Sequence, residues 1–224
     1  MIRHLNSDIS FCELDNQLFF LDIRGDRYFQ LSRALEHNFL SYLETPGDAS
    51  IDISGLVKHN LLPLASESPC NGPTTGIVSP SESAIEIPGS TKHISLDVVQ
   101  DVFLTVAVMR WQLKVRRLKP ILQALSNYRE GKTSPHSDGH IGQQRLLEAA
   151  TSFNSVRPYV PIETCCLIDS LSMVRFLAKR GLHAHLVMGI ACDPFSAHAW
   201  VQHGPLVLNE TVGVAQAHVP IRVI

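Results

Sequence analysis

Three residues near the C-terminus have the types and the order of a thiol catalytic site. Cys166 opens a helical pattern in TCCLIDSLSMVRFLAKRGL, His198 lies in the strand-like segment PFSAHAWVQ, and Glu210 lies in PLVLNET. A helix N-terminus and a nearby imidazole both lower the pKa of a thiol from about 8.5. We therefore expect Cys166 to be the nucleophile and His198 its base. Glu210 would hold the imidazole through its Nδ1 hydrogen.

The same segment allows other interpretations of these residues. A cysteine near a helix start is more often a small buried apolar residue, and a lone histidine in an apolar strand is usually a hydrogen-bonded core residue. Cys165 competes with Cys166 as the nucleophile, and Asn209 could orient the histidine in place of Glu210. The residue types alone leave both alternatives open.

The remaining histidines raise the possibility of a metal site. His183 and His185 would lie on one face of a strand, with several cysteines and histidines nearby in the sequence. Zinc sites are typically built from CxxC pairs or an HExxH helix, and the chain has neither motif. The sequence therefore predicts no metal, and we expect His183 and His185 to be half-exposed strand residues. We expect no other cofactor.

Charge and cysteine usage limit the possible partners. The 224 residues include 19 basic and 21 acidic ones, so no overall field attracts nucleic acid. The five cysteines have no framework spacing, and the first residues lack the apolar core of a secretory signal, which indicates a reduced, cytoplasmic protein. The most apolar stretch, residues 102–109, is far too short to span a bilayer. We expect no membrane segment.

The first part of the chain reads as a small domain over residues 1–65. Residues 8–31 alternate apolar strands with turn residues, Asp15-Asn16 and Arg24-Gly25-Asp26, which predicts an antiparallel meander. Ser32 is expected to cap a helix that buries one face, and a second short helix is expected at 53–61. The residues expected on the buried face of the first helix are Leu35, Phe39, Leu40 and Leu43.

Residues 66–92 have the composition of a linker, rich in proline, glycine and serine. A second domain is expected over 93–224. It would begin with a helix at 97–125 that Pro120 kinks or breaks, then a helix at 143–153 and an extended segment at 158–161. The cysteine helix and an antiparallel sheet would follow. The basic residues between 110 and 119 form either a solvated face or a docking face.

At these residues the chain resembles the lasso peptide biosynthesis B proteins, the leader peptidases of ribosomally made, threaded-ring peptides. The matching segments are CL and SL at 166–167 and 170–171, Leu177, Gly181, AHLVMG at 184–189, PFSAHAWV at 194–201 and VLNE at 207–210. The resemblance implies a transglutaminase- or papain-like α+β peptidase domain. It also carries the family's Cys-His-Asp triad over as Cys166, His198 and Glu210, with glutamate at the usual aspartate position.

The N-terminal part resembles, over LDIRGDRYFQLS at 21–32, the PqqD-like element that recognises leader peptides. This implies a winged-helix-type domain of three antiparallel strands plus helices, on which the leader adds a strand. Apolar leader side chains would pack toward a second helix near Leu56. The strand residues implied in leader binding are Asp26, Arg27, Tyr28, Phe29, Gln30 and Leu31.

Together these patterns predict a cytoplasmic cysteine peptidase that binds the leader of a lasso precursor and cuts it from the core through a thioester. The resemblance implies an asparagine-synthetase-like, ATP-using cyclase as partner, whereas this chain has no phosphate loop. Two alternatives are a transglutaminase-type acyltransferase, which would pass the acyl group to an amine, and a non-catalytic leader-binding chaperone.

Overall fold

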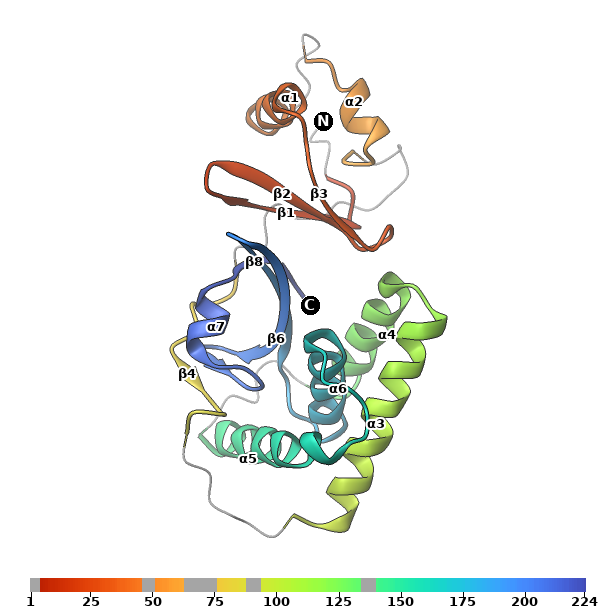
Figure 1. The fold of residues 1–224 in the computed structure, drawn as a ribbon, viewed down its shortest axis with the longest axis vertical. Coiled ribbons are helices and arrows are strands. Elements are labelled where there is room, and N and C mark those ends of the chain that lie inside the picture. Colours follow the sequence, from red (N-terminus) through yellow and green to blue (C-terminus); the bar gives the residue numbers. More distant parts are fainter. Residues whose placement is uncertain (1–4, 46–50, 63–75, 88–93, 134–139) are drawn as a thin grey trace. The chain divides into compact units, whose positions relative to one another are not determined.

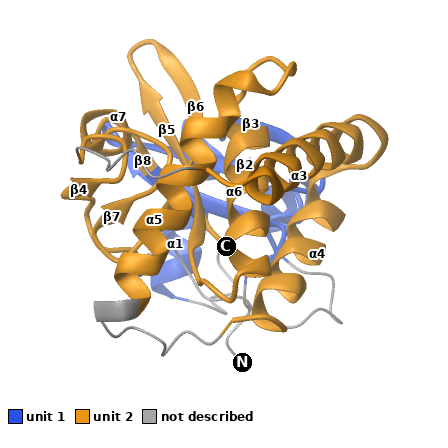
Figure 2. Ribbon diagram, turned by 90° about the horizontal axis from the view of Figure 1, so that it is seen from below, with its two compact units in different colours: residues 1–76, 220–222 blue, residues 77–219, 223–224 orange. Residues whose placement is uncertain are grey.

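The chain forms two compact units, each with its own layers of helix and sheet. The computed structural model describes residues 5–45, 51–62, 76–87, 94–133 and 140–224 (Figure 1). Unit 1 comprises residues 1–76 and 220–222, and unit 2 comprises residues 77–219 and 223–224 (Figure 2). Both units mix helices with sheet, so the predicted α+β class is confirmed.

Unit 1 contains the predicted meander. Its elements are β1 Ile9–Leu14, β2 Gln17–Asp22, β3 Arg27–Gln30, α1 Arg33–Glu44 and α2 Ser54–Lys58. The strands are antiparallel in the order β1-β2-β3, with Phe11 opposite Phe20 and Phe20 opposite Phe29. The first turn is tight because Asp15 and Asn16 both have positive φ, which matches the twist of the two strands.

The helices of unit 1 cover one face of this sheet through an aromatic core. The Phe39 ring of α1 lies 5.1 Å from Phe11 and 5.2 Å from Phe20. The buried face of α1 is formed by Phe39 and Tyr42, whereas Leu40 and Leu43 are exposed, so that part of the prediction is wrong. Large rings fill the space over the sheet and turn the leucines outward. Ser32 is the N-cap residue, but its side chain makes no capping bond.

The second sheet is mixed and has five strands. The elements from β4 onward are β4 Glu82–Ser83, α3 Leu96–Val115, α4 Leu118–Glu130, α5 His140–Val156, η1 Arg157–Tyr159, α6 Cys166–Lys179, β5 His185–Cys192, β6 Phe195–His203, β7 Leu206–Val207, α7 Val212–Gln216 and β8 Val219–Val223, and all lie in unit 2 except residues 220–222 of β8. The strand order is β4-β7-β6-β5-β8, with β4 parallel to β7 and the β5–β6 hairpin antiparallel. Helix α6 packs against α3, α4, α5 and β6.

Part of the predicted linker belongs to unit 2. Of residues 66–92, the structure describes 76–87, and these include β4. Side-chain amides fix the segment at two points: Gln202 donates to the Val78 carbonyl (2.7 Å) and Gln216 to the Pro80 carbonyl (2.8 Å). The linker prediction is therefore wrong over this stretch, because long-range hydrogen bonds order a sequence with little local preference.

Two further differences concern the segments before the cysteine helix. The predicted helix at 97–125 is two helices, which separate at Arg116 and Arg117, both in extended conformation. Pro120 then lies in the first turn of α4, where a missing N–H leaves no bond unmade. The expected extended segment at 158–161 begins instead as the 3₁₀ turn η1. None of the described helices is both long and apolar enough to cross a membrane.

Candidate active site

Helix α6 places Cys166 at its first turn. Cys165 is the N-cap residue, in extended conformation, and its carbonyl accepts the N–H of Asp169 at 2.9 Å. The helix is anchored by a largely apolar buried face that includes Ile168 and Leu171. The half-buried Cys166 thiol is therefore held at a fixed place, whereas Cys165 is exposed.

The backbone of β6 meets α6 at the peptide groups of Ala199. The Ala199 N–H hydrogen-bonds to the Cys166 sulfur, and the Ala199 carbonyl accepts the Ser170 hydroxyl at 3.0 Å. Cys166 and Ser170 are one helical turn apart, so both contact the Ala199 backbone from the same face of α6. Helix α6 therefore contacts β6 at the residue that follows His198.

The imidazole of His198 is bonded to the predicted carboxylate. His198 Nε2 donates to Glu210 Oε2 at 2.9 Å, with both side chains partly buried. The sequence interpretation assigned this bond to Nδ1, and that detail is wrong. The ring stacks on the fully buried Trp200, with centroids 6.3 Å apart, and this packing fixes its orientation. The bond to Glu210 thus leaves Nδ1 as the ring nitrogen that can take up a proton.

Two further hydrogen bonds, besides the one to His198, fix the position of Glu210. Its second carboxylate oxygen, Oε1, accepts the Thr211 N–H at 2.9 Å, and its backbone carbonyl accepts the Ser83 hydroxyl at 2.6 Å. The extra methylene of glutamate relative to aspartate is accommodated by this geometry, in which one carboxylate bonds both the imidazole and its own loop. Ser83 lies in β4, within the stretch predicted to be linker.

Asn209, the alternative orienting residue, faces a different group. Its amide nitrogen donates to the Ser170 hydroxyl at 2.9 Å, and its amide oxygen accepts the Val201 N–H at 2.7 Å. Asn209 therefore links α6 to β6, and the geometry gives the contact with His198 to Glu210 instead.

The acidity of the thiol differs from the sequence-based expectation. Burial raises the pKa of Cys166 above its ordinary value, and the nearby Cys165 and Asp169 act in the same direction. Hydrogen bonds from the backbone N–H groups of Ala199 and Leu167 oppose this shift without reversing it. The expected lowering of the pKa by the helix N-terminus is outweighed by desolvation.

A partly buried ion pair near the thiol was missed by sequence reasoning. Arg157 Nε donates to Asp169 Oδ1 at 2.6 Å, and its other guanidinium nitrogens donate to the carbonyls of Ile162 (3.0 Å) and Glu163 (3.1 Å). Burial raises the pKa of Asp169, and the bond to Arg157 counteracts that rise. Arg157 thus ties the segment that precedes Cys166 to the first turns of α6.

Another ring near the site was also missed. The His218 ring lies 5.1 Å from that of His198, with its Nε2 3.2 Å from the Ser196 hydroxyl. Directly across the hairpin from His198 is Gly189, where an added Cβ would lie 2.8 Å from the Trp200 ring. A glycine at this position lets Trp200 pack beneath His198.

The histidines considered as metal ligands contact each other. The rings of His183 and His185 lie 4.8 Å apart, and burial lowers the pKa of His185. Within the described ranges, no three His, Cys, Asp or Glu side chains are grouped so that they could hold a metal ion.

In unit 1, most of the predicted leader-binding residues lie in β3 or next to it. Arg27, Tyr28, Phe29 and Gln30 form β3, and Asp26 lies in the preceding turn with φ of 52°. Leu56 is fully buried in the unit 1 core, and packing of the leader toward the helix that carries it stays a prediction.

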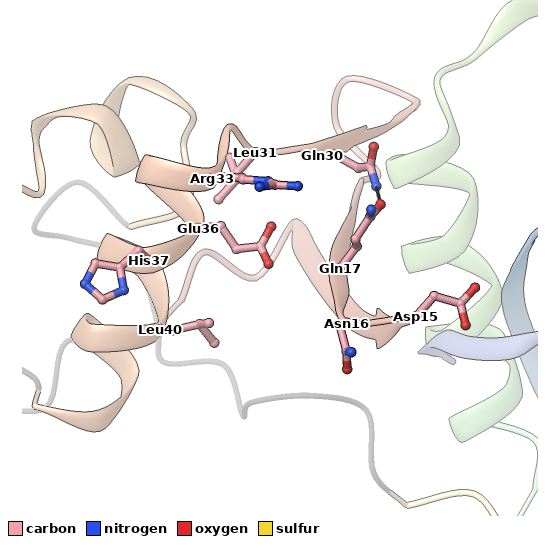
Figure 3. Close-up of a pocket in the computed structure, with 9 residues that line it drawn as sticks. All are labelled: Asp15, Asn16, Gln17, Gln30, Leu31, Arg33, Glu36, His37 and Leu40. Atoms are coloured by element: carbon pink, nitrogen blue, oxygen red, sulfur yellow. Dashed lines mark hydrogen bonds between the residues drawn. The ribbon is translucent and has the colours of Figure 1, made fainter.

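Gln30 and Leu31 line a pocket of about 590 Å³ where β3 passes into α1. Figure 3 shows Arg33, Glu36, His37 and Leu40 of α1 on one side of this pocket and residues 15–17 of the β1–β2 turn on the other. The Gln30 amide donates to the Gln17 side-chain oxygen at 2.9 Å. Most of these lining residues are polar.

Comparison with known proteins agrees with the architecture of unit 2. The model of the transglutaminase-like superfamily matches residues 109–223, just over half of the chain, and the protein therefore belongs to this superfamily. The chain is also similar to the microcin J25-processing protein McjB of Escherichia coli, with 26% identity over 109 residues. That alignment covers 49% of this chain and 50% of McjB, so the chain matches about half the length of this relative. No solved structure matches the chain significantly.

Proposed function

We propose that this protein is a cysteine peptidase of lasso peptide biosynthesis, which removes the leader segment from a ribosomally made precursor. The arrangement around Ala199 carries the proposal: its N–H bonds the Cys166 sulfur, and the preceding His198 donates to Glu210 at 2.9 Å. A thiol, a base and an orienting carboxylate are the parts that acyl transfer through a thioester requires. The similarity to McjB, whose name describes processing of microcin J25, supports the substrate class.

In the first step, the Cys166 sulfur attacks the carbonyl carbon between leader and core. His198 takes the thiol proton at Nδ1, the ring nitrogen opposite its bond to Glu210, and returns it to the leaving amine as the peptide C–N bond breaks. The leader is then held as a thioester on Cys166, and the core leaves with a free N-terminus.

In the second step, water attacks the thioester while His198 takes its proton. The C–S bond breaks, the leader carboxylate is released and the thiol is restored. Burial raises the pKa of Cys166 and so favours the neutral thiol, which requires His198 to act as a general base that takes the proton as the sulfur attacks.

Unit 1 would hold the leader in the manner of PqqD-like elements. Strand β3 is last in the order β1-β2-β3, so no described strand pairs with its outer edge. A leader strand would add there along Arg27, Tyr28, Phe29 and Gln30, and the pocket at Gln30 and Leu31 would receive a side chain at the end of that strand. The released core would pass to an asparagine-synthetase-like cyclase.

The test is product analysis by mass spectrometry after the full chain is mixed with the precursor encoded next to its gene. Leader and core separated with the gain of one water support the proposal. A leader joined to added glycine amide identifies an acyltransferase instead. An intact precursor that nevertheless binds, as measured by fluorescence anisotropy, identifies a non-catalytic leader-binding protein and contradicts the proposal.

A further inference from the structure

A pocket of about 460 Å³ lies in unit 2, and residues close in sequence to Cys166 and Glu210 line it. Thr164 and Asp169, which flank Cys166 along the chain, both line it, and so does Asn209, the neighbour of Glu210. Its other walls come from residues 84–87 after β4 and from α5 and η1. This volume falls in the range of sites that bind small ligands or side chains, about 300–1,000 Å³.

One wall of the pocket is apolar and open to solvent. Ile85 is 49% exposed and Ile87 is 38% exposed, although both line the pocket, while Ala84 and Phe153 are buried beside them. Removing such apolar surface from water is favourable, so an apolar group that fills the pocket gains affinity.

The charges at the pocket are already paired. Asp169 bonds Arg157 at 2.6 Å, and the remaining guanidinium donors of Arg157 reach the carbonyls of Ile162 and Glu163. Asn154, also on the wall, donates to the Leu208 carbonyl at 2.8 Å. A charged ligand would lose its hydration in this pocket without finding a free partner of opposite charge, which favours an uncharged occupant.

The apolar wall is connected to the proposed catalytic acid. The Ser83 hydroxyl accepts the Ile85 N–H at 3.1 Å and donates to the Glu210 carbonyl at 2.6 Å. Through this one side chain, the position of Ile85 is fixed relative to Glu210 and therefore to His198. A group bound against Ile85 is thus held in a fixed position relative to the proposed acid and base.

We propose that this pocket is a specificity subsite, which binds an apolar side chain of the substrate within two residues of the scissile bond on its acyl side. It rests on the proposed function, since the acyl side is the leader in that reaction. An occupied pocket would position the leader carbonyl over Cys166 and select leaders that end in an apolar residue.

Peptidyl chloromethyl ketones test this on the full chain, because they alkylate a catalytic thiol and place their side chains on the acyl side. The reagents are Ala-Gly-Gly, Ala-Leu-Gly, Ala-Gly-Leu and the matching glutamate peptides, with alkylation of Cys166 followed by mass spectrometry. We expect one leucine reagent to react about 10-fold or more faster than the glycine reagent, and the glutamate reagents to react no faster than it.

Ile85→Asn should remove this preference, and Val78→Asn is the matched control, since Val78 is 57% exposed in the same segment and lies outside the pocket. Circular dichroism checks the fold of both variants. Equal rates for all reagents, or a preference that survives in Ile85→Asn, would overturn the subsite. Failure of iodoacetamide to alkylate Cys166 in the wild type would instead count against the proposed nucleophile, so the two failures are distinguishable.

Discussion

Replacing Glu210 by Gln removes the charge that faces His198 while keeping the shape of the side chain. The bond lost joins His198 Nε2 to Glu210 Oε2 at 2.9 Å, and the two side chains are only 19% and 24% exposed. A hydrogen bond to a charged group contributes about 1.5–3 kcal/mol net, and each 1.36 kcal/mol changes a rate about tenfold. We expect kcat/KM for leader removal to fall about 10- to 100-fold.

The assay is cleavage of the precursor peptide, followed by liquid chromatography, in a double-mutant cycle with His198→Ala. Since Glu210 acts only through the imidazole, Glu210→Gln should have no further effect once His198 is replaced. Glu210→Asp should be mild, because it keeps the charge. Wild-type rates for Glu210→Gln, or losses that add in the double variant, would refute the orienting role.

Three further predictions concern the Cys166 thiol, the Arg157–Asp169 ion pair and the edge strand β3. In a Cys165→Ser background, the rate of Cys166 alkylation by iodoacetamide should keep rising with pH above about 8.5, because a raised pKa preserves the thiol form to higher pH. A rate that reaches a plateau below pH 7 would show a preformed thiolate and contradict the raised pKa. Arg157→Ala should lower the free energy of unfolding, measured in urea, by about 3 kcal/mol at pH 7, because the Asp169 carboxylate loses its partner. The loss should be smaller in acid, where that carboxylate takes up a proton. A loss below about 1 kcal/mol at pH 7 would contradict a stabilising role of the ion pair. Successive N–H groups of a strand point to opposite edges, so only one of the variants Tyr28→Pro and Phe29→Pro removes a hydrogen bond to β2. The other variant should stay folded by circular dichroism and bind the leader more weakly. Unchanged leader affinity in both variants would exclude pairing along β3.

Local sequence patterns predicted the elements that depend on local interactions. The Asp15-Asn16 turn was predictable because both residues tolerate positive φ, and the start of α6 was predictable from the apolar spacing that follows Cys166. Strand β4 was not, because Ser83 lies in a segment rich in proline and serine, and its order comes from pairing with Val207 far along the chain.

The residues of the candidate site likewise divide into those that the sequence predicted and those that depend on long-range packing. The order of cysteine, histidine and acid in the sequence pointed to His198 and Glu210, which the fold brings within hydrogen-bond distance. Which ring nitrogen bonds the acid depends on packing against Trp200, and no sequence pattern reports that. Arg157 was missed because an arginine is usually exposed, whereas this one is buried by contacts with two backbone carbonyls and Asp169.

The most direct test of the central claim compares Cys166→Ala with Cys165→Ala in the cleavage of the precursor peptide. The two thiols are neighbours, but only Cys166 receives the Ala199 N–H beside His198. We expect Cys166→Ala to abolish leader removal with leader affinity unchanged, because β3, the strand proposed to bind the leader, belongs to the other unit, and Cys165→Ala to retain activity. Normal cleavage by Cys166→Ala, or loss of cleavage in Cys165→Ala alone, would contradict the account.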